Sequence, residues 1–377
     1  MNVTCIDIYE VEIPFKVSFS HSLKTRTSSE SIIVKITLDN GSCGYGEGLP
    51  REYVTGETTL SVALDIKDKL APFLIGKSFS SLQEALDIFK NKDYEHFNDC
   101  GSSAVCAVST AFLDAVTKAH NKSIADVIGS QKRDKIFYTG VISSGEMKKV
   151  IKYALLYRLG GFKYIKLKVG TPDDIEKLRV VRRIVGKSTD IRVDANCAWN
   201  YDQARDIIEQ MKIYGVSTVE QPLPKEDIEG IKKLTQSSGL YISADESLTS
   251  VNDARMLAKD KVFNMFNIRL SKCSGIFDAL SIYHIAKENN IKCQFGCQVG
   301  ETSILSAAQR HVAMTLPDVD YIEGSYSTHL LKSDIVLKPV KFGYRGIGRP
   351  IAGTGLGIQV DETLLKKYTT NTLILTS

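Results

Sequence analysis

The sequence lacks a large excess of charge of either sign, because 48 basic and 44 acidic residues leave a net charge of +4. Its lysines are dispersed, so we expect no nucleic acid among its partners. The sequence also lacks a long apolar stretch, and its first residues (MNVTCIDIYEVEI) are acidic where a signal peptide would be basic. We therefore expect a cytoplasmic protein that is neither exported nor membrane-bound.

A regular spacing is missing from the eight cysteines. Free thiols in a reducing compartment are therefore expected, rather than disulfides or a zinc site. We interpret Cys293 and Cys297 as core packing at a strand end. The six histidines fall outside the repeat described next, so they receive no role.

The one repeat is a series of charged residues spaced about 26 residues apart: Lys168, Asp194, Glu220, Asp245 and Lys272. That interval suits one strand plus one helix, so the five residues would occupy equivalent places in successive units. The local text supports strand ends, as in YIKLKVG and IRVDAN, and helical patterns lie between the runs. Alternating strands and helices predict a parallel sheet.

Further strand-like runs at residues 135–141, 292–296 and 320–323 extend the series to eight strands. Eight such units predict a β/α barrel, in which the carboxyl ends of the strands carry the chemistry. The five charges are therefore expected to face one mouth.

The length of 377 residues favours a second domain beside the barrel. We predict an α+β capping domain at residues 1–130, the barrel at 131–331, and a segment at 332–377 that returns to the cap. The expected cap strands are residues 6–13, 31–38 and 44–47, and the expected cap helices are residues 58–74, 81–89 and 102–120.

Asp194, Glu220 and Asp245 end three consecutive predicted strands, so their side chains would converge. Buried carboxylates repel one another unless a cation neutralises them. All-oxygen ligands, with no His or Cys nearby in sequence, suit Mg²⁺. One such carboxylate alone would more often cap a helix or pair with a lysine, but three at matched strand ends favour the metal.

Lys166 and Lys168 alternate on one predicted strand and so face the same side. At about 6.6 Å apart, two ammonium groups repel by about 2.5 kcal/mol at an effective dielectric near 20, which lowers a lysine pKa by roughly 1.8. We therefore predict that Lys168 is a general base tuned by Lys166. The alternative is two lysines that only solubilise the mouth.

Lys272 follows the sixth predicted strand, across the barrel from Lys168. Two lysines on opposite faces of a metal-held substrate indicate that one removes a proton and the other returns one. The predicted reaction is proton abstraction α to a carboxylate through an enediolate, with racemisation or epimerisation as the result.

The strings KLKVG, VDAN, EQP, ADES and NIRLSKCSG closely resemble the enolase superfamily, within its muconate lactonizing enzyme subgroup. The likeness covers nearly the whole chain. It implies a modified (β/α)7β TIM barrel with an N-terminal α+β cap, Mg²⁺ on the three carboxylates, and acid–base chemistry by Lys168 and Lys272. By analogy, a homo-oligomer is expected.

The cap segments SHSLKTRTSSE, GYGEGLP and YVTGET are similar to those of dipeptide epimerases such as the Ala-Glu enzyme. This resemblance implies an L-Ala-L-Glu-like substrate, whose distal carboxylate would lie under Lys24 and Arg26. The remaining candidates for substrate contacts are Thr139, Gln298 and Glu323. Candidates for supporting hydrogen bonds are Asn196, Gln221 and Glu246.

The chain departs from the dipeptide epimerases after the eighth strand. Their Asp-x-Asp motif, which binds the substrate ammonium, is replaced here by Gly324 and Tyr326, leaving Glu323 as the nearby carboxylate. Other readings therefore stay open: a muconate-type cycloisomerase, an o-succinylbenzoate synthase, an N-acylamino acid racemase, or a non-catalytic carboxylate-binding protein.

Overall fold

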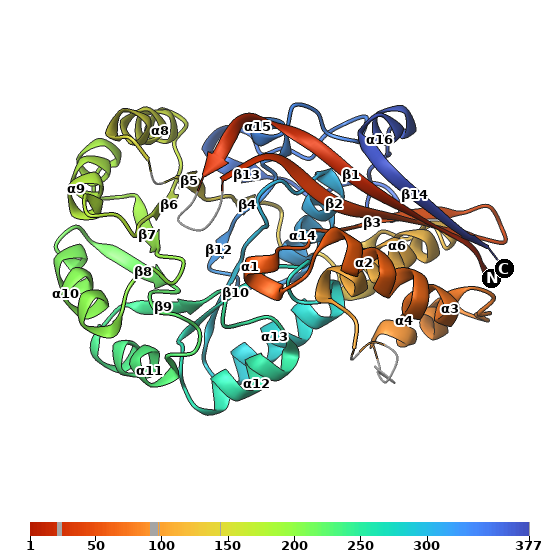
Figure 1. Cartoon of the computed structure of the whole chain (residues 1–377), viewed down its shortest axis with the longest axis horizontal. Helices are drawn as coiled ribbons and strands as arrows, with labels where there is room; N and C mark the ends of the chain where they lie inside the picture. The colour runs from red at the N-terminus through yellow and green to blue at the C-terminus, as the bar shows by residue number, and fades with distance from the viewer. Residues whose placement is uncertain (21–24, 91–96, 98, 144, 377) are drawn as a thin grey trace.

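The cap is built on an antiparallel sheet that joins the two ends of the chain. The computed structural model describes residues 1–20, 25–90, 97, 99–143 and 145–376. The sheet has the order β14-β1-β2-β3, with β1 (Val3–Ser20), β2 (Thr25–Leu38), β3 (Cys43–Gly48) and β14 (Thr369–Thr376). Because β14 pairs with β1 beside it (Figure 1), the predicted return of the C-terminal segment to the cap is confirmed.

One long helix, α6 (Ser102–Ala119), packs closely on β3 because that face of the strand consists of glycines. A Cβ added at Gly46 would lie 1.9 Å from the carbonyl oxygen of Ala107, so only glycine admits this approach. The other cap helices are α1 (Glu52–Thr55), α2 (Thr59–Asp65), the π-helix η1 (Ile66–Leu70), α3 (Ala71–Leu74), α4 (Leu82–Lys90) and α7 (Ile124–Ile128).

The barrel is an eight-stranded parallel sheet in sequence order, with a helix between each pair of successive strands. This arrangement confirms the predicted α/β class and the modified (β/α)7β TIM barrel (Figure 1). The strands are β5 (Gly140–Ile142), β6 (Tyr164–Lys168), β7 (Asp190–Asp194), β8 (Val216–Glu220), β9 (Tyr241–Ala244), β10 (Met265–Ile268), β11 (Lys292–Phe295) and β12 (Tyr321–Ile322). The helices are α8 (Met147–Leu159), α9 (Asp174–Val185), α10 (Tyr201–Lys212), α11 (Ile228–Ser237), α12 (Val251–Lys259), α13 (Ile276–Glu288) and α14 (Ser303–Thr315).

One predicted strand, residues 135–141, is divided between two sheets. Its first part, β4 (Ile136–Phe137), pairs antiparallel with β13 (Ile347–Gly348), while β5 belongs to the barrel. The division falls at Tyr138, whose amide donates to Gly346 of the C-terminal segment. The remaining elements are α15 (Ser327–Leu330), the 3₁₀ turn η2 (Tyr344–Gly346) and α16 (Glu362–Tyr368).

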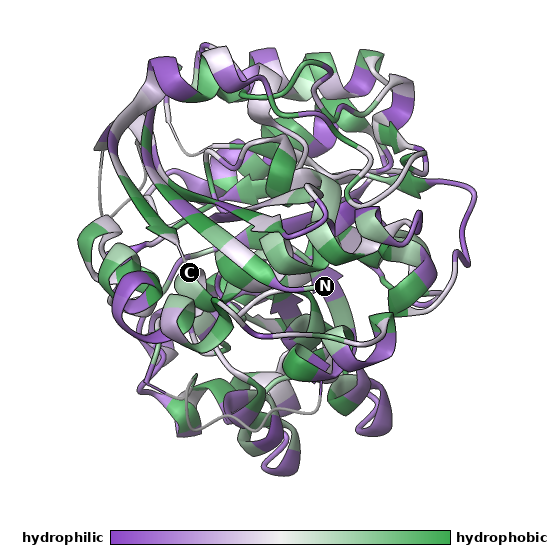
Figure 2. Cartoon of the chain, turned by 90° about the vertical axis from the view of Figure 1, so that its right-hand side faces the viewer, coloured by the Kyte–Doolittle hydropathy of each residue, from purple (hydrophilic) through white to green (hydrophobic). Residues whose placement is uncertain are grey.

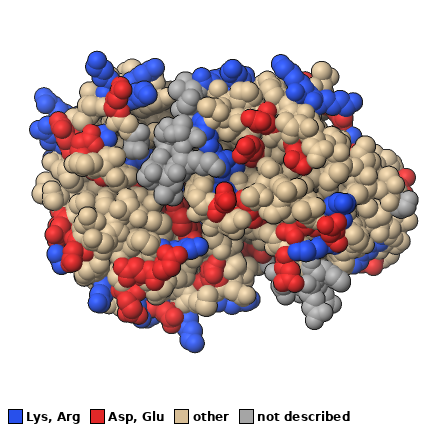
Figure 3. Space-filling view, in the orientation of Figure 1, with Lys and Arg blue, Asp and Glu red and all other residues tan. Residues whose placement is uncertain are grey.

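Outer helices such as α9, α10 and α12 are amphipathic, and green and purple residues lie side by side on helices in Figure 2. Acidic and basic side chains are intermixed on the face shown in Figure 3. All eight cysteines lie among the described residues, and none forms a disulfide. Within the described part of the chain, no helix has the length and apolarity needed to cross a membrane. The domain boundaries at residues 130 and 331 stay a prediction.

Candidate active site

The structure brings the five periodic charges to one end of the barrel. Lys168, Asp194 and Glu220 are the last residues of β6, β7 and β8 and are paired in register. Asp245 directly follows β9, and Lys272 comes four residues after β10. The three carboxylates and Lys272 are buried, because the C-terminal ends of all the parallel strands meet at this end of the barrel.

Ion pairs bind these carboxylates to the surrounding cations. Lys168 Nζ lies 2.7 Å from Asp194 Oδ2, and Lys272 Nζ lies 2.8 Å from Asp245 Oδ1. Arg269 reaches between two carboxylates, at 3.6 Å from Glu220 Oε1 and in a short contact with Asp245 Oδ2. The carboxylates are therefore close enough to share cations, as the sequence predicted.

The middle carboxylate of the three differs from its neighbours. Burial, followed by repulsion from Asp194, raises the pKa of Glu220 to about 8. Burial acts in the same direction on Asp194, but Lys168 and Lys166 outweigh it and hold the pKa of Asp194 well below its usual range. Burial and the neighbouring carboxylates therefore outweigh the cations near Glu220, of which Lys166 is the nearest at 3.3 Å.

The donor set at the mouth fits a divalent cation. We call the five periodic charges the ladder. Its three carboxylates supply only oxygen, and beside them Glu246 Oε2 is buried without a hydrogen-bond partner among the described residues. Burial and the charge of Asp245 raise the pKa of Glu246 to about 7. Within the described residues, no three His, Cys, Asp or Glu side chains are gathered as ligands around one point, because Lys166 and Arg269 lie between the carboxylates.

Lys166 lies among carboxylates, and its predicted tuning of Lys168 stays a prediction. Its Nζ lies 2.6 Å from Glu323 Oε2 and 3.3 Å from both Asp194 Oδ2 and Glu220 Oε1. Burial opposes the charge, but these carboxylates outweigh it and raise the pKa of Lys166. The sequence argument omitted the acidic groups that the barrel places around Lys166.

The three candidates for supporting hydrogen bonds lie around the ladder. Asn196 accepts from Lys168 Nζ at 2.7 Å and donates to Glu246 Oε1 at 3.0 Å, so it joins the lysine to the fourth carboxylate. Gln221 Oε1 accepts from the backbone amide of Asp245 at 3.0 Å. Both side chains therefore orient groups at the mouth, although their roles stay a prediction.

The candidate substrate contacts fare differently. Lys24 lies outside the described residues. Arg26 pairs with Glu30 at 3.5 Å. Thr139 was wrongly placed, because it is buried beneath the mouth and accepts from Arg192 Nη2 at 3.1 Å. Gln298 lines the pocket that opens from the barrel mouth.

Glu323 lines the pocket too, but its charge is already engaged. Lys166 lies 2.6 Å from its Oε2, and Arg192 lies 2.8 Å from its Oε1. Burial would raise its pKa, but these two cations lower it. A substrate ammonium at Glu323 would have to share the carboxylate with them.

Sequence reasoning missed a layer of polar residues beneath the ladder. Glu220 accepts from Asn267 Nδ2 at 2.9 Å and from Gln294 Nε2 at 2.6 Å, and Arg192 lies one level below Asp194 on the same strand. Alternation was the available signal, because Arg192 lies two positions before Asp194 just as Lys166 lies two before Lys168. Cys297, which we took for core packing, reaches the pocket, as do Arg269 and Glu301.

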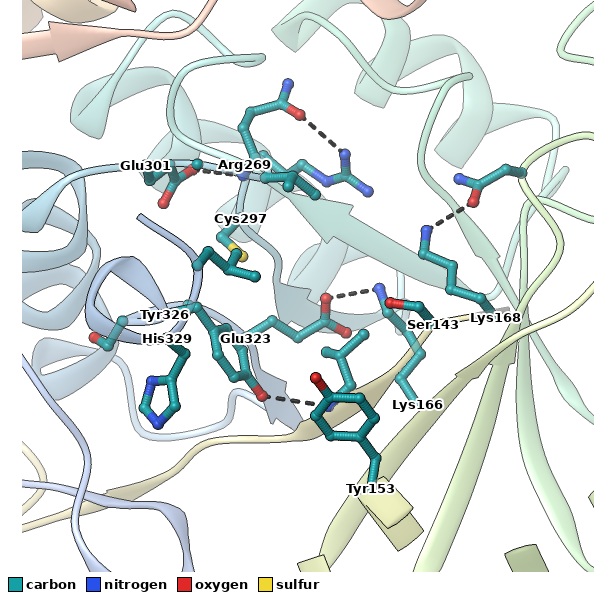
Figure 4. Close-up of a pocket in the computed structure, with 18 of the residues that line it drawn as sticks. Ser143, Tyr153, Lys166, Lys168, Arg269, Cys297, Glu301, Glu323, Tyr326 and His329 are labelled. Atoms are coloured by element: carbon teal, nitrogen blue, oxygen red, sulfur yellow. Dashed lines mark hydrogen bonds and ion pairs between the residues drawn. The ribbon is translucent and has the colours of Figure 1, made fainter. Parts of the chain in front are cut away.

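The mouth opens into a pocket of about 490 Å³, within the range of small-molecule sites. Figure 4 shows Lys166 and Glu323 facing each other in the middle of this pocket, with Lys168 nearby. The pocket reaches Lys168 and Glu246, while Lys272 is not among the described residues that line it.

Two family models match the chain: "Mandelate racemase / muconate lactonizing enzyme, N-terminal domain" over residues 3–129 and "Enolase C-terminal domain-like" over residues 149–364. The chain belongs to the enolase superfamily. An N-succinyl-L-Arg/Lys racemase of Bacillus cereus is 29% identical over 98% of both chains, and its crystal structure superposes with a TM-score of 0.91, covering 100% of each. A chloromuconate cycloisomerase of Cupriavidus necator is 31% identical over 98% of this chain and 99% of its own.

A dipeptide epimerase of Enterococcus faecalis, solved with Mg and the dipeptide L-Leu-L-Tyr, is 28% identical with a TM-score of 0.87. The match covers 95% of this chain and 100% of that one. These relatives of the chain are a racemase, a cycloisomerase and an epimerase, and the chain is likewise an isomerase.

Proposed function

We propose that this enolase-superfamily isomerase epimerises dipeptides at the carbon α to the terminal carboxylate by 1,1-proton transfer. One observation carries the proposal: two lysines on opposite sides of the barrel mouth each pair with a different outer carboxylate of a buried acidic triplet. A protein that only bound carboxylates would not need a second proton carrier across the barrel.

Asp194, Glu220 and Asp245 would hold Mg²⁺, with Glu246 beside them. When bound, the metal supplies positive charge that holds the substrate carboxylate and offsets the negative charge formed as the α-proton leaves. A Mg-bound relative, the Enterococcus faecalis epimerase, supports this cofactor.

Lys168 would exchange a proton with one face of the α-carbon, because its Nζ lines the pocket and is oriented by Asp194 and Asn196, each at 2.7 Å. Lys272 would serve the opposite face. Its Nζ donates to Asp245 O at 2.6 Å, to Asp245 Oδ1 at 2.8 Å and to Asn267 O at 3.1 Å, so three acceptors fix its position. To reach the substrate, Lys272 Nζ would have to leave one of these acceptors and turn toward the α-carbon.

The test is α-proton exchange in D₂O with saturating Mg²⁺, using L-Ala-L-Glu and L-Leu-L-Tyr as first substrates. We expect loss of the α-proton signal of the terminal residue and growth of the other epimer. If no dipeptide exchanges under these conditions, the dipeptide assignment is wrong.

A cycloisomerase is the second candidate, because Lys272 lies away from the described pocket lining and a lactonisation can proceed with one lysine as proton donor. The relative in Cupriavidus necator supports it. Incubation with cis,cis-muconate separates the two: loss of the diene absorbance without dipeptide exchange would favour the cycloisomerase.

A further inference from the structure

The pocket has a part that the proposed proton transfer does not use, formed by six aromatic rings. We name it the aromatic limb: Tyr153, Tyr157, Phe162, Tyr326, His329 and Phe342, all of which line the pocket. The rings form an unbroken series, with centroids 6.3 Å apart for Tyr153 and Tyr157, 4.8 Å for Tyr157 and Phe162, and 5.8 Å for Phe162 and Phe342. Phe342 also lies 5.3 Å from both Tyr326 and His329.

The polar groups of the limb are turned away or neutral, so the rings offer the pocket an apolar surface. Tyr157 Oη donates to Val141 O at 2.9 Å, and Tyr326 Oη makes a short hydrogen bond to Thr139 O. Burial, together with nearby lysines, lowers the pKa of His329, which keeps its imidazole neutral at pH 7. These anchors fix the rings before a ligand arrives, which lowers the entropic cost of binding.

Charge and aromaticity are separated within the pocket. The charged lining residues lie on barrel strands or in the loops that follow them, with Glu301 just before α14. The limb instead comes from α8, α15 and the loop segments at Phe162 and Phe342. Figure 4 shows this separation, with Arg269 and Glu301 on one side, Tyr153, Tyr326 and His329 on the other, and the Lys166–Glu323 pair between. A ligand that fills the pocket would therefore be charged at one end and apolar at the other.

The outer end of the limb carries apolar side chains that the core does not require. On α8, Tyr153 is 42% exposed and Leu156 is 51% exposed, yet both line the pocket. The adjacent Leu155 is 46% exposed and does not belong to the lining. Substituting Leu155 and Leu156 in turn therefore distinguishes the loss of exposed apolar surface on α8 from the loss of a part of the pocket wall.

We propose that the aromatic limb binds a bulky apolar group of the substrate, aromatic by preference, at the end away from the reacting carboxylate. The inference rests on the proposed function, and it makes the substrate a dipeptide with an aromatic or large aliphatic residue rather than an acidic one. A second carboxylate in the limb would lose its hydration without gaining a cation among the described limb residues. An aromatic ring instead gains edge-to-face contacts.

The first measurement compares kcat/KM for exchange of L-Ala-L-Phe, L-Phe-L-Ala, L-Ala-L-Leu and L-Ala-L-Glu, which place the apolar group at either end. We expect the best aromatic dipeptide to exceed L-Ala-L-Glu by about 100-fold, the discrimination that a fitted apolar pocket provides. Leu156→Ala removes three carbon atoms from the pocket wall, so KM for that dipeptide should rise by at least about tenfold, the lower end of the effect of one methylene in an apolar pocket, with a smaller effect on kcat. Leu155→Ala, the matched control, should match the wild type.

A second measurement needs no turnover: calorimetric binding of 3-phenylpropionate and of glutarate in the presence of Mg²⁺. The aromatic acid should bind at least tenfold more tightly, and Leu156→Ala should remove most of the difference. If L-Ala-L-Glu is the best dipeptide and Leu156→Ala behaves like Leu155→Ala, the limb assignment is wrong while the proposed function stands. If no dipeptide exchanges but 3-phenylpropionate is preferred, the proposed function fails and the limb assignment stands. Equal binding of the two acids overturns the limb assignment in either case.

Discussion

Two groups of buried charges in this molecule differ in the partners that neutralise them. At the barrel mouth, side chains neutralise side chains: Lys168 pairs with Asp194, Lys272 with Asp245, and Lys166 with Glu323. Where the cap meets the barrel, in a contact that we call the cap joint (Glu47, Arg51 and their partners on residues 299–305), the partners come mainly from the backbone.

The cap joint uses groups that cannot move away. Glu47 accepts from the amides of Thr302 at 2.9 Å and Leu305 at 3.1 Å, at the start of α14. Arg51 donates to the carbonyls of Pro50 at 2.7 Å, Val299 at 2.7 Å and Glu30 at 3.2 Å. Backbone partners are fixed by the fold, so these charges position the cap over the pocket.

The mouth, in contrast, is held by partners that can change. A lysine or arginine side chain can rotate, and a divalent cation or a substrate carboxylate can take its place. We infer that buried charges paired with oppositely charged side chains mark the site of chemistry, even where a backbone carbonyl also accepts, as for Lys272. Buried charges held without an oppositely charged side chain mark the structural contact. Substitutions at the two places should therefore separate activity from stability.

The largest effect should follow Lys168→Met, which removes the proton carrier that faces the pocket. General acid–base groups contribute about 10²–10⁴-fold, so we expect α-proton exchange to fall by at least about 10³-fold. Mg²⁺ binding, measured by calorimetry, should be as tight or tighter, because the cation that competes for Asp194 is gone. Retained exchange in this variant would refute the role of Lys168.

Lys272→Met should separate the two halves of the reaction. The epimer whose proton is taken by Lys168 should still exchange with solvent, while formation of the opposite epimer should fall by about 10²-fold or more. Nuclear magnetic resonance in D₂O resolves the two rates. Lys259→Met, on the exposed face of α12, controls for the loss of a lysine elsewhere. Equal loss of exchange from both epimers would contradict the division of faces.

The mouth could be predicted from the sequence because its residues obey the period of the fold. One strand and one helix take about 26 residues, so equivalent strand ends recur at that interval, and Lys168 to Lys272 follow it. Alternation along the strand adds Lys166 and Arg192. What the period cannot show is which side chains meet across the barrel, such as Lys166 and Glu323.

The aromatic limb and the cap joint could not be predicted, because their residues follow no common interval. Tyr153 and Phe342 come from a helix and a C-terminal loop and meet only through the rings between them. Glu47 reads in the sequence as one more polar residue of a short strand, and its partner Thr302 lies 255 residues away. Such contacts depend on how the cap is placed on the barrel, which local patterns do not encode.

Arg51→Met should lower the stability of the fold more than the rate of α-proton exchange. Its guanidinium is buried and donates to three carbonyls, and hydrogen bonds of charged groups contribute about 1.5–3 kcal/mol. We expect the free energy of unfolding, from urea denaturation, to fall by about 3 kcal/mol. Arg205→Met, at an exposed pair with Asp202, should change it by less than about 1 kcal/mol. A loss of exchange as large as that of Lys168→Met, without loss of stability, would contradict the separation of the two places.

The last prediction concerns Glu47 and the pH dependence of stability. Burial raises the pKa of Glu47 to about 7, although hydrogen bonds from Thr302 and Leu305 oppose the shift. Between the ordinary glutamate pKa of about 4.3 and about 7, the unfolded chain releases this proton and the folded chain keeps it. The contribution of Glu47 to the free energy of unfolding is therefore complete at low pH and is lost as the pH rises, by at most about 1.4 kcal/mol per pH unit.

Glu47→Gln removes this titration. The free energy of unfolding of the wild type minus that of Glu47→Gln, measured by urea denaturation from pH 4.5 to 7.5, should decrease as the pH rises. Glu209→Gln, on the exposed face of α10, should give a constant difference over the same range. Parallel curves for the wild type and Glu47→Gln would mean that Glu47 is ionised throughout. The fixed amides at the start of α14 would then neutralise a buried charge as fully as the lysines do at the mouth.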